Sequence, residues 1–259
     1  MPLPQNSSTL LEVQCSKWRE YDDKGEGHLP VFFLIFLTTI HSYANKMNAD
    51  SLITLFLNGS ENVYLDGVAM LATKAWIWIG LYLTILFVVF REHDMRQFLG
   101  ILLGLLLCVL VADQVSSGIV KPLVARYRPT HSPEIAHLTD VVCGYRGGMY
   151  GFFSSHASNT MAIAVFLSLI FRKKIITLTL IAWSLLNCWT RLYLGVHYCS
   201  DILVGLLFGC LTGSIVYLLY RFSFGKHPNR NYVVQRLTLI TTSFALTLLI
   251  IAVPWKLFL

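Results

Sequence analysis

The distribution of apolar residues constrains the fold of this chain more than any other feature. Short polar connections separate the apolar stretches, apart from the longer segment 121–155. Only 13% of the residues are charged, against roughly 25% in globular proteins. Six apolar stretches each approach the ~20 residues that cross a bilayer as a helix, at residues 68–90, 98–120, 156–171, 175–190, 202–220 and 237–253. The sequence therefore predicts an all-α, polytopic membrane protein with six transmembrane helices.

The positions of the basic residues predict which way the helices run. Alternate connections are basic, as cytoplasmic loops tend to be, and contain Arg91, Arg96, Arg172, Lys173, Lys174, Arg221, Lys226, Arg230 and Arg236. The other connections then face outward, although they also carry Lys121, Arg126, Arg128, Arg146 and Arg191. We interpret these outward cations as functional. The net charge of +6 is spread along the chain without a basic stripe, which argues against a nucleic-acid partner.

The first part of the chain differs from the rest. Residues 1–46 are an N-terminal segment whose apolar run, 31–40, is too short to span a bilayer, and residues 47–259 form a single membrane domain. Residues 48–58 are typical of a short amphipathic helix on the outer surface. An alternative hypothesis starts translation at Met47, and loss of activity on deleting residues 2–46 would contradict it.

The first polar cluster follows the second apolar stretch. Lys121 and Arg128 are seven residues apart, close to two helical turns, which predicts that both lie on one helix face before Pro129 stops the helix. For Lys121 alone, a basic side chain reaching for lipid headgroups is the simpler explanation. Together with Arg126 and Arg128, it favours an anion site.

The second cluster precedes the third stretch. Ser154 and Ser155 bring hydroxyls and free backbone amides to a helix start, where the helix dipole favours phosphate, although both serines also suit ordinary N-caps. His156 adds an imidazole able to transfer a proton near neutral pH. This combination favours a phosphate site with a proton donor.

The third cluster lies between the fourth and fifth stretches. His197 and Asp201 are four residues apart, so on a helix their side chains meet and the carboxylate fixes the ring tautomer. Arg191 precedes them. The alternative of a metal site is disfavoured because the nearby cations would repel a divalent ion, so we expect no metal and no other cofactor.

Two further polar features lie outside the three clusters. Asp113 falls inside the second stretch, and Lys74 in the first is a possible structural partner for it. Cys143 and Cys199 both fall on the predicted outer side, but we expect no disulfide between them.

The three clusters together resemble the three signature motifs of the type 2 phosphatidic acid phosphatase superfamily. These motifs read Lys, six residues, Arg-Pro; then Ser-x-His; then Arg, five residues, His, three residues, Asp, within about residues 68–236. The departures are Phe153 for the usual Pro, Ser155 for the usual Gly and Thr190 for the usual Ser. None of them removes a charged or proton-transferring group.

The resemblance implies a role for each residue of the motifs. His197 would attack phosphorus and carry a phosphohistidine, Asp201 would orient it, and His156 would protonate the leaving oxygen and then activate water. The phosphoryl oxygens would be bound by Lys121, Arg128, Arg191, Ser154, Ser155 and backbone amides. No metal would be required.

A membrane lipid phosphate or diphosphate is the substrate class that the resemblance and the apolar helices imply. We rank undecaprenyl diphosphate first, with lipid A 1-phosphatase and phosphatidylglycerol phosphate phosphatase activities as alternatives. The expected location is the bacterial inner membrane, with the active site at the outer interface and facing the periplasm or cell exterior. A transporter of a phosphorylated solute would explain the cations but would leave His197, Asp201 and His156 without a task.

Overall fold

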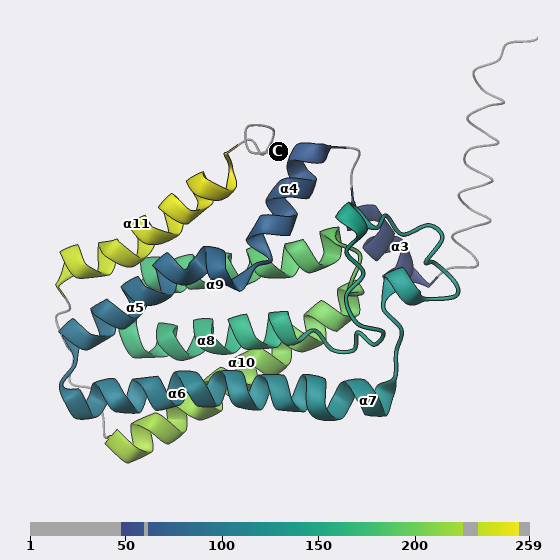
Figure 1. The fold of residues 1–259 in the computed structure, drawn as a ribbon. Helices are drawn as coiled ribbons and strands as arrows, with labels where there is room; N and C mark the ends of the chain where they lie inside the picture. Colours follow the sequence, from purple (N-terminus) through teal and green to yellow (C-terminus); the bar gives the residue numbers. More distant parts are fainter. Residues whose placement is uncertain (1–47, 60–61, 225–232, 254–259) are drawn as a thin grey trace, which may run out of the picture. The chain divides into compact units, whose positions relative to one another are not determined.

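The described residues of the computed structural model, 48–59, 62–224 and 233–253, are helical and form no strand, with one isolated bridge between Tyr127 and Tyr150. The chain divides into two units, Met1–Ala49 and Asp50–Leu259. The main helices are α3 (Ala49–Leu57), α4 (Val63–Ala72), α5 (Ile79–Glu92), α6 (Met95–Asp113), α8 (Ser155–Phe171), α9 (Lys174–Tyr193), α10 (Cys199–Phe224) and α11 (Val234–Ile251) (Figure 1). Short helical segments are η1 (Ala75–Trp78), the π-helix η2 (Gln114–Val120), α7 (Lys121–Val124), η3 (Pro129–His131) and η4 (Val142–Gly144).

Four helical segments in the described part of the chain are long and apolar enough to cross a membrane: Ala75–Glu92, Met95–Val124, Lys174–Tyr193 and Cys199–Phe224. Helices α8 and α11 are also apolar but shorter. The prediction of an all-helical membrane protein is confirmed. The number of crossings that the structure supports by length and composition is four.

The predicted first span, residues 68–90, is wrong as a single helix. Helix α4 ends at Ala72, Lys74 has an extended backbone, and a new helical segment starts at Ala75. The Thr73 hydroxyl at this break accepts a hydrogen bond of 2.6 Å from Arg191. The interruption therefore serves a contact with α9 that is remote in sequence.

Helix α8 lies at the centre of the bundle, because it packs against α6, α9 and α10. Three glycines of α10, at four-residue spacing, face the α8 backbone: Gly205, Gly209 and Gly213. A Cβ atom at Gly209 would lie 2.6 Å from the Ser158 carbonyl oxygen, and one at Gly205 would lie 2.7 Å from that of Ser154. This absence of side chains lets the two backbones approach closely and fixes the start of α8 against the start of α10.

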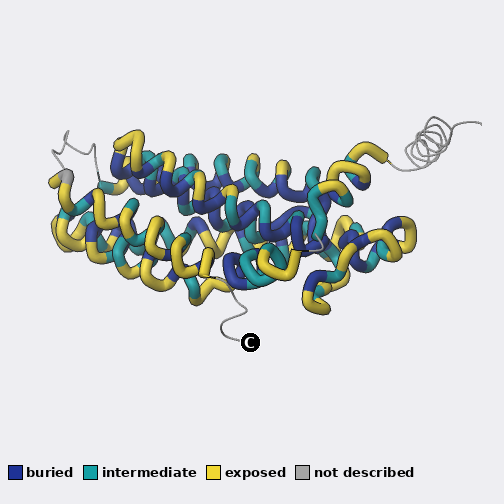
Figure 2. The backbone as a smooth tube through the Cα atoms, turned by 90° about the horizontal axis from the view of Figure 1, so that it is seen from above, coloured by how far each residue is buried: buried dark blue, intermediate teal, exposed yellow. Residues whose placement is uncertain are grey.

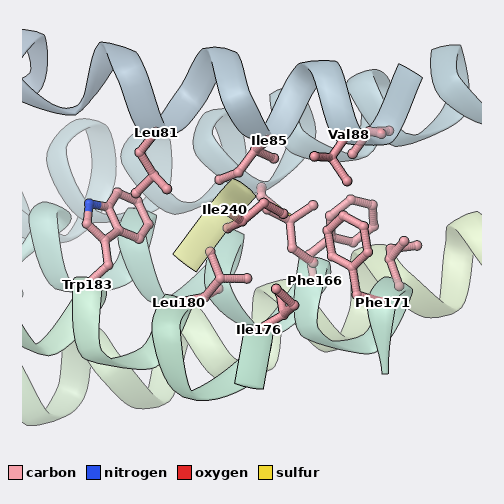
Figure 3. Close-up of a cluster of buried hydrophobic side chains, with 14 of the residues drawn as sticks. Leu81, Ile85, Val88, Phe166, Phe171, Ile176, Leu180, Trp183 and Ile240 are labelled. Carbon is pink, nitrogen blue, oxygen red and sulfur yellow. The ribbon is translucent and has the colours of Figure 1, made fainter. Parts of the chain in front are cut away.

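A buried apolar cluster joins α5, α8, α9 and α11 (Figure 3). Leu81 and Ile85 of α5 meet Leu180 and Trp183 of α9 in this cluster, and Ile240 of α11 lies among them. Exposed segments line the outer sides of the helices (Figure 2). Four leucines at helical spacing on α6 are each at least 50% exposed, namely Leu99, Leu103, Leu106 and Leu110. Such apolar stripes suit contact with lipid chains.

Helix α3 confirms the predicted amphipathic helix at 48–58, but its polar side faces the protein. Ser51 and Thr54 are buried, whereas Phe56 is 87% exposed. Leu52 and Ile53 are also exposed. The apolar side of α3 is therefore the side available to a bilayer.

Candidate active site

The polar residues gather where α7 and α9 end and α8 and α10 begin, beside the connection 125–154 (Figure 1). That connection folds back on itself, since Arg128 N donates to Met149 O at 3.0 Å and Gly151 N donates to Arg126 O at 2.9 Å. Ala125, with φ of 48°, ends α7, and Arg128 has an extended backbone. The prediction of one helix face carrying both Lys121 and Arg128 is wrong, because the left-handed residue stops the helix before Arg128.

His197 lies in the turn between α9 and α10, and not on a helix as its spacing from Asp201 predicted. Asp201 is in the first turn of α10, and its Oδ2 accepts a hydrogen bond of 3.0 Å from the Tyr198 amide. The same Oδ2 lies 3.4 Å from His197 Nδ1. The predicted pair therefore meets, but across a capping turn.

Two glycines give this turn its shape and its cover. Gly195 has φ of +64°, and a Cβ atom there would lie 2.6 Å from Thr139 Cγ2, so the turn that presents His197 needs glycine. A Cβ atom at Gly151 would lie 3.0 Å from Asp201 Oδ2 and 3.6 Å from His197 Nδ1. The connection thus lies directly against the histidine and the carboxylate.

Two neighbours of the His197 ring define its tautomer, namely Arg128 at Nε2 and Asp201 at Nδ1. Arg128 Nη1 lies 3.2 Å from Nε2 and also donates to the Val196 carbonyl oxygen at 2.9 Å. A guanidinium can only donate, so Nε2 is the acceptor and the proton of a neutral ring sits on Nδ1, facing Asp201. The lone pair of Nε2 therefore points toward Arg128.

The contact between His197 Nδ1 and Asp201 is close but not aligned. Although the two atoms lie at ion-pair distance, Nδ1 makes no hydrogen bond within the described residues. Catalytic hydrogen bonds are often poorly aligned in empty sites. Burial first, and then the charges of Arg128 and Arg191, lower the pKa of His197 well below its ordinary value, so the ring is neutral at neutral pH.

Lys121 follows directly after the π-helix η2, a distortion often found at functional sites. Its Nζ donates to Ser117 Oγ and to Ser155 Oγ, both at 3.1 Å. Ser117 in turn donates to Asp113 at 3.4 Å. Asp113 therefore contacts the Lys121 chain through Ser117, in place of the predicted pairing with Lys74.

Arg191 is buried near the end of α9. Its Nη1 donates to Thr73, and its Nη2 donates to the Tyr145 hydroxyl at 3.2 Å. Burial favours the neutral phenol, but the charge and hydrogen bond of Arg191 outweigh it and lower the pKa of Tyr145. The Arg191 Nε is buried without a hydrogen-bond partner in the described structure.

Lys121, Arg128 and Arg191 share one property. None of the three forms a salt bridge with a carboxylate of the described residues, and their hydrogen-bond partners there are hydroxyls, carbonyl oxygens and the His197 ring. The charges of all three act on both His156 and His197. Burial, followed by the charge of Arg191, lowers the pKa of Arg128 to about 10, so it stays charged at neutral pH. Three uncompensated cations beside two imidazoles form a site for a multiply charged anion.

The start of α8 supplies the remaining predicted residues. Ser154 is the N-cap: its Oγ accepts from the Ala157 amide at 3.4 Å, and its amide donates to the Asp201 carbonyl oxygen at 3.1 Å. Ser155 and His156 follow as the first helical residues, and the Ser155 hydroxyl contacts Lys121. The amides of Ser155 and His156 have no acceptor in the described part of the chain, as helix-start amides that bind anions require.

Sequence reasoning misjudged Arg126 and missed Asp50. Arg126, which the sequence grouped with the anion-binding cations, forms salt bridges of 2.8 Å with Asp201 and 2.7 Å with Asp50. Asp50 lies about 150 positions from its other partner, Ser200, and no spacing rule joins them. Tyr145 and Thr73, the partners of Arg191, also carried no signal in the sequence.

The described residues hold no group of three or more His, Cys, Asp or Glu side chains arranged to bind a metal ion. Cys143 and Cys199 are both free thiols.

Comparisons with known proteins agree on one family. The sequence description of the PAP2 superfamily, the type 2 phosphatidic acid phosphatases, matches residues 99–224. Lipid A 4'-phosphatase of Porphyromonas gingivalis is 36% identical over 197 residues, which cover 73% of this chain and 84% of that protein. Lipid A 4'-phosphatase of Bacteroides thetaiotaomicron is 35% identical over 172 residues, covering 66% of this chain and 76% of that protein.

A comparison with solved structures finds a similar fold. A transmembrane PAP2 type phosphatidylglycerolphosphate phosphatase from Bacillus subtilis, known from a crystal structure, superposes with a TM-score of 0.52 at 23% identity and covers 77% of this chain and 96% of its own. The chain belongs to the PAP2 superfamily and is a membrane phosphatase.

Proposed function

We propose that this protein removes the 4'-phosphate of lipid A in a bacterial membrane. The observation that carries the proposal is a set of three cations, the buried Arg128 and Arg191 and the half-buried Lys121, beside the accepting nitrogen of His197. They have no carboxylate salt-bridge partner among the described residues. The two lipid A 4'-phosphatases, matched over most of their length, favour this substrate over the undecaprenyl diphosphate that we ranked first from the sequence. They also favour the 4' position over the 1 position.

Phosphate binding supplies the first step. Lys121, Arg128 and Arg191 would each take a phosphoryl oxygen, with the amides of Ser155 and His156 as further donors at the start of α8. A phosphoryl oxygen is a better acceptor for a guanidinium than an imidazole nitrogen is. Arg128 would therefore leave Nε2 for the phosphate and free its lone pair for attack.

The chemistry then proceeds in two displacements. His197 Nε2 forms a bond to phosphorus while the bond from phosphorus to the 4' oxygen breaks. His156, protonated once the negative phosphate offsets the three cations around it, gives that proton to the 4' oxygen. His156 next takes a proton from water, whose oxygen attacks phosphorus and breaks the N–P bond, releasing phosphate. Asp201 holds the Nδ1–H side of the ring and offsets its positive charge in the intermediate.

A sugar oxygen is a poor leaving group without a proton. His156 is half-buried beside the cations, and its ring makes no hydrogen bond within the described part of the chain, so it is available to a leaving oxygen. Fixed cations would perform the charge stabilisation that magnesium performs in kinases. We therefore propose metal-independent hydrolysis, in which full activity persists in excess chelator.

We also propose six crossings of the inner membrane, with the site at the periplasmic interface. The 17 residues of α8 span about 25 Å, close to the ~30 Å hydrocarbon core, and α11 has 18 residues. Cys143 is an exposed free thiol on the site side. A membrane-impermeant thiol reagent should label it in intact spheroplasts, with Cys143→Ser as the control, and labelling only after permeabilisation would reverse the orientation.

The decisive experiment compares substrates with purified protein in detergent. Lipid A carrying both phosphates, undecaprenyl diphosphate and phosphatidylglycerol phosphate are incubated separately, and products are identified by mass spectrometry. We expect the fastest turnover on lipid A, with a product that keeps the 1-phosphate. Faster turnover of undecaprenyl diphosphate, or loss of the 1-phosphate, would contradict the substrate assignment, and inactivity on all three would contradict the function.

A further inference from the structure

The polar side of α3 meets the start of α10 through Asp50. Asp50 Oδ1 accepts from the Ser200 amide at 2.9 Å, and Oδ2 accepts from the Ser200 hydroxyl and from Arg126 Nη2. Burial alone would raise the pKa of Asp50, but these hydrogen bonds reverse the effect and hold the pKa below its usual value. Asp50 is therefore an ionised carboxylate that accepts hydrogen bonds from the Ser200 amide, the Ser200 hydroxyl and Arg126.

Arg126 is held on every side. Its Nη1 donates to Ser200 Oγ at 2.7 Å and to Asp201 Oδ1 at 2.8 Å, while Nη2 donates to Asp50. Its guanidinium lies 4.0 Å from the centre of the Tyr198 ring. A guanidinium with these four contacts has one orientation, and Asp50 supplies the outermost of them.

Arg126 in turn fixes the carboxylate that faces His197. Asp201 is fully buried. Its Oδ1 accepts a hydrogen bond from Arg126, and its Oδ2 accepts one from the Tyr198 amide and lies 3.4 Å from His197 Nδ1. Rotation of the Asp201 carboxylate would break the contact with Arg126. The orientation that places Oδ2 near His197 thus depends on where Arg126 lies.

The charge of Asp50 also influences Asp201 through the arginine that the two carboxylates share. Arg126 is shared between two carboxylates, so Asp50 takes up part of the positive charge that would otherwise act on Asp201 alone. A less neutralised Asp201 stabilises a positive imidazole better. That charge develops on His197 only when it forms a bond to phosphorus, so the effect belongs to the transition state.

We propose that Asp50 is a positioning residue of the phosphatase site, which holds Arg126 so that Arg126 holds the Asp201 carboxylate beside His197 Nδ1. This inference rests on the proposed phosphatase function. It makes α3 a part of the catalytic apparatus, although no residue of α3 touches the phosphate site directly in the contacts described above.

The test variant is Asp50→Asn in the full chain, which keeps the shape of the side chain and removes its charge. We expect kcat on lipid A to fall about 10- to 100-fold, less than the ~10,000-fold loss that follows when a catalytic histidine loses its orienting carboxylate in a serine protease. KM and the inhibition constant of inorganic phosphate should stay within about twofold, since the cations that bind phosphate are unchanged. Asp50→Glu should recover part of kcat.

The matched control is Thr54→Val on the same helix. Thr54 Oγ1 accepts from the Cys199 amide at 3.0 Å and donates to the Asp50 backbone carbonyl oxygen at 2.7 Å. This variant therefore weakens the contact between α3 and α10 but leaves the Asp50 carboxylate and its charge in place. It should keep kcat. Unchanged kcat in a folded Asp50→Asn protein, or an equal loss of kcat in Thr54→Val, would overturn the proposal.

A second measurement does not depend on turnover. The nitrogen spectrum of labelled histidine in micelles reports the tautomer of His197, which the structure places on Nδ1. The Nδ1–H fraction should fall in Asp50→Asn and stay in Thr54→Val, and an unchanged spectrum would contradict the role of Asp50. If the wild-type protein hydrolyses no lipid phosphate, that result contradicts the proposed function alone, because the tautomer measurement tests the role of Asp50 without turnover.

Discussion

Arg126 and Arg128 lie two positions apart in the same connection but in regions of opposite character. Arg126 bridges Asp50 and Asp201 and stacks on Tyr198, so each of its charged contacts is compensated. Arg128 donates to the carbonyl oxygens of Tyr150 and Val196 and to an imidazole. The region around Arg126 is a network of paired opposite charges. The region around Arg128 keeps a positive charge without a carboxylate partner among the described residues, so it can bind an anionic ligand.

The difference teaches how to tell a structural cation from an anion-binding one. Desolvation and mutual repulsion lower the pKa of Arg128 to about 10, whereas for Arg126 the hydrogen bond to Asp50 and the nearby carboxylates outweigh desolvation and raise the pKa. A bound phosphate would supply the missing negative charge in the second region. Residue type and spacing do not distinguish the two arginines, but their partners do.

His197 touches both regions, and removing it should give the largest effect. His197→Ala takes away the atom that bonds to phosphorus, so turnover should fall at least about 10,000-fold and no phosphoenzyme should form. The measurement is phosphate release together with acid-quench trapping of labelled protein. Residual activity near that of the wild type would show that another group is the nucleophile.

Replacing each arginine by glutamine should separate the two regions. Arg128→Gln removes a donor for the phosphoryl oxygens, so kcat/KM should fall about 100- to 1,000-fold. The same change removes an uncompensated buried charge, so the thermal midpoint without phosphate should stay the same or rise.

Arg126→Gln should behave in the opposite way toward stability. The variant leaves Asp201 buried without its cation, so the thermal midpoint should fall by a few degrees. The cost in the free energy of unfolding should be about 1–3 kcal/mol, since Arg126 is 28% exposed and solvent screens part of the ion pair. Added inorganic phosphate should stabilise the wild type and Arg126→Gln but not Arg128→Gln. Equal phosphate stabilisation of both variants would erase the distinction between the regions.

The pH profile should show the cations acting on His197. Protonation blocks attack by His197, and its pKa lies well below 6.5, so kcat/KM should lose no activity to this group until the pH falls well below 6.5. In Arg128→Gln one cause of the lowering is gone, so the acidic limb should move to higher pH. A wild-type limb at or above pH 6.5 would contradict the described electrostatics.

Much of the helical body was predictable, because a membrane-spanning helix needs a long apolar stretch, and every predicted stretch except 68–90 lies mostly in continuous helix. The break at Thr73 was not predictable, since the Thr73 hydroxyl bonds Arg191, a residue 118 positions further along the chain. In the site, motif spacing identified which residues would meet. It misplaced their backbones: His197 lies in a capping turn and Arg128 in an extended segment, because Gly195 and Ala125 take left-handed conformations.

The compensated region was the least visible in the sequence. Asp50 looked like one acidic residue of a surface helix, and its role depends on Ser200 and Arg126, both far away in the chain. Local patterns report on neighbours along a helix or turn. A charge network built from three separate segments leaves no such pattern.

Ser155→Gly should give the smallest effect, because it alters one neutral contact of one cation. Ser155 Oγ accepts from Lys121 Nζ at 3.1 Å, and a glycine at this position would leave Lys121 with Ser117. A hydrogen bond to a charged group contributes about 1.5–3 kcal/mol, but a phosphoryl oxygen that takes the place of Ser155 Oγ recovers most of it. We therefore expect kcat/KM to fall less than about tenfold and kcat to change little. Lys121→Gln is the matched comparison, since it removes the charge itself. If Ser155→Gly were as damaging as Lys121→Gln, the serine would be more than a support for the lysine, and the uncompensated region would depend on its hydroxyls as much as on its charges.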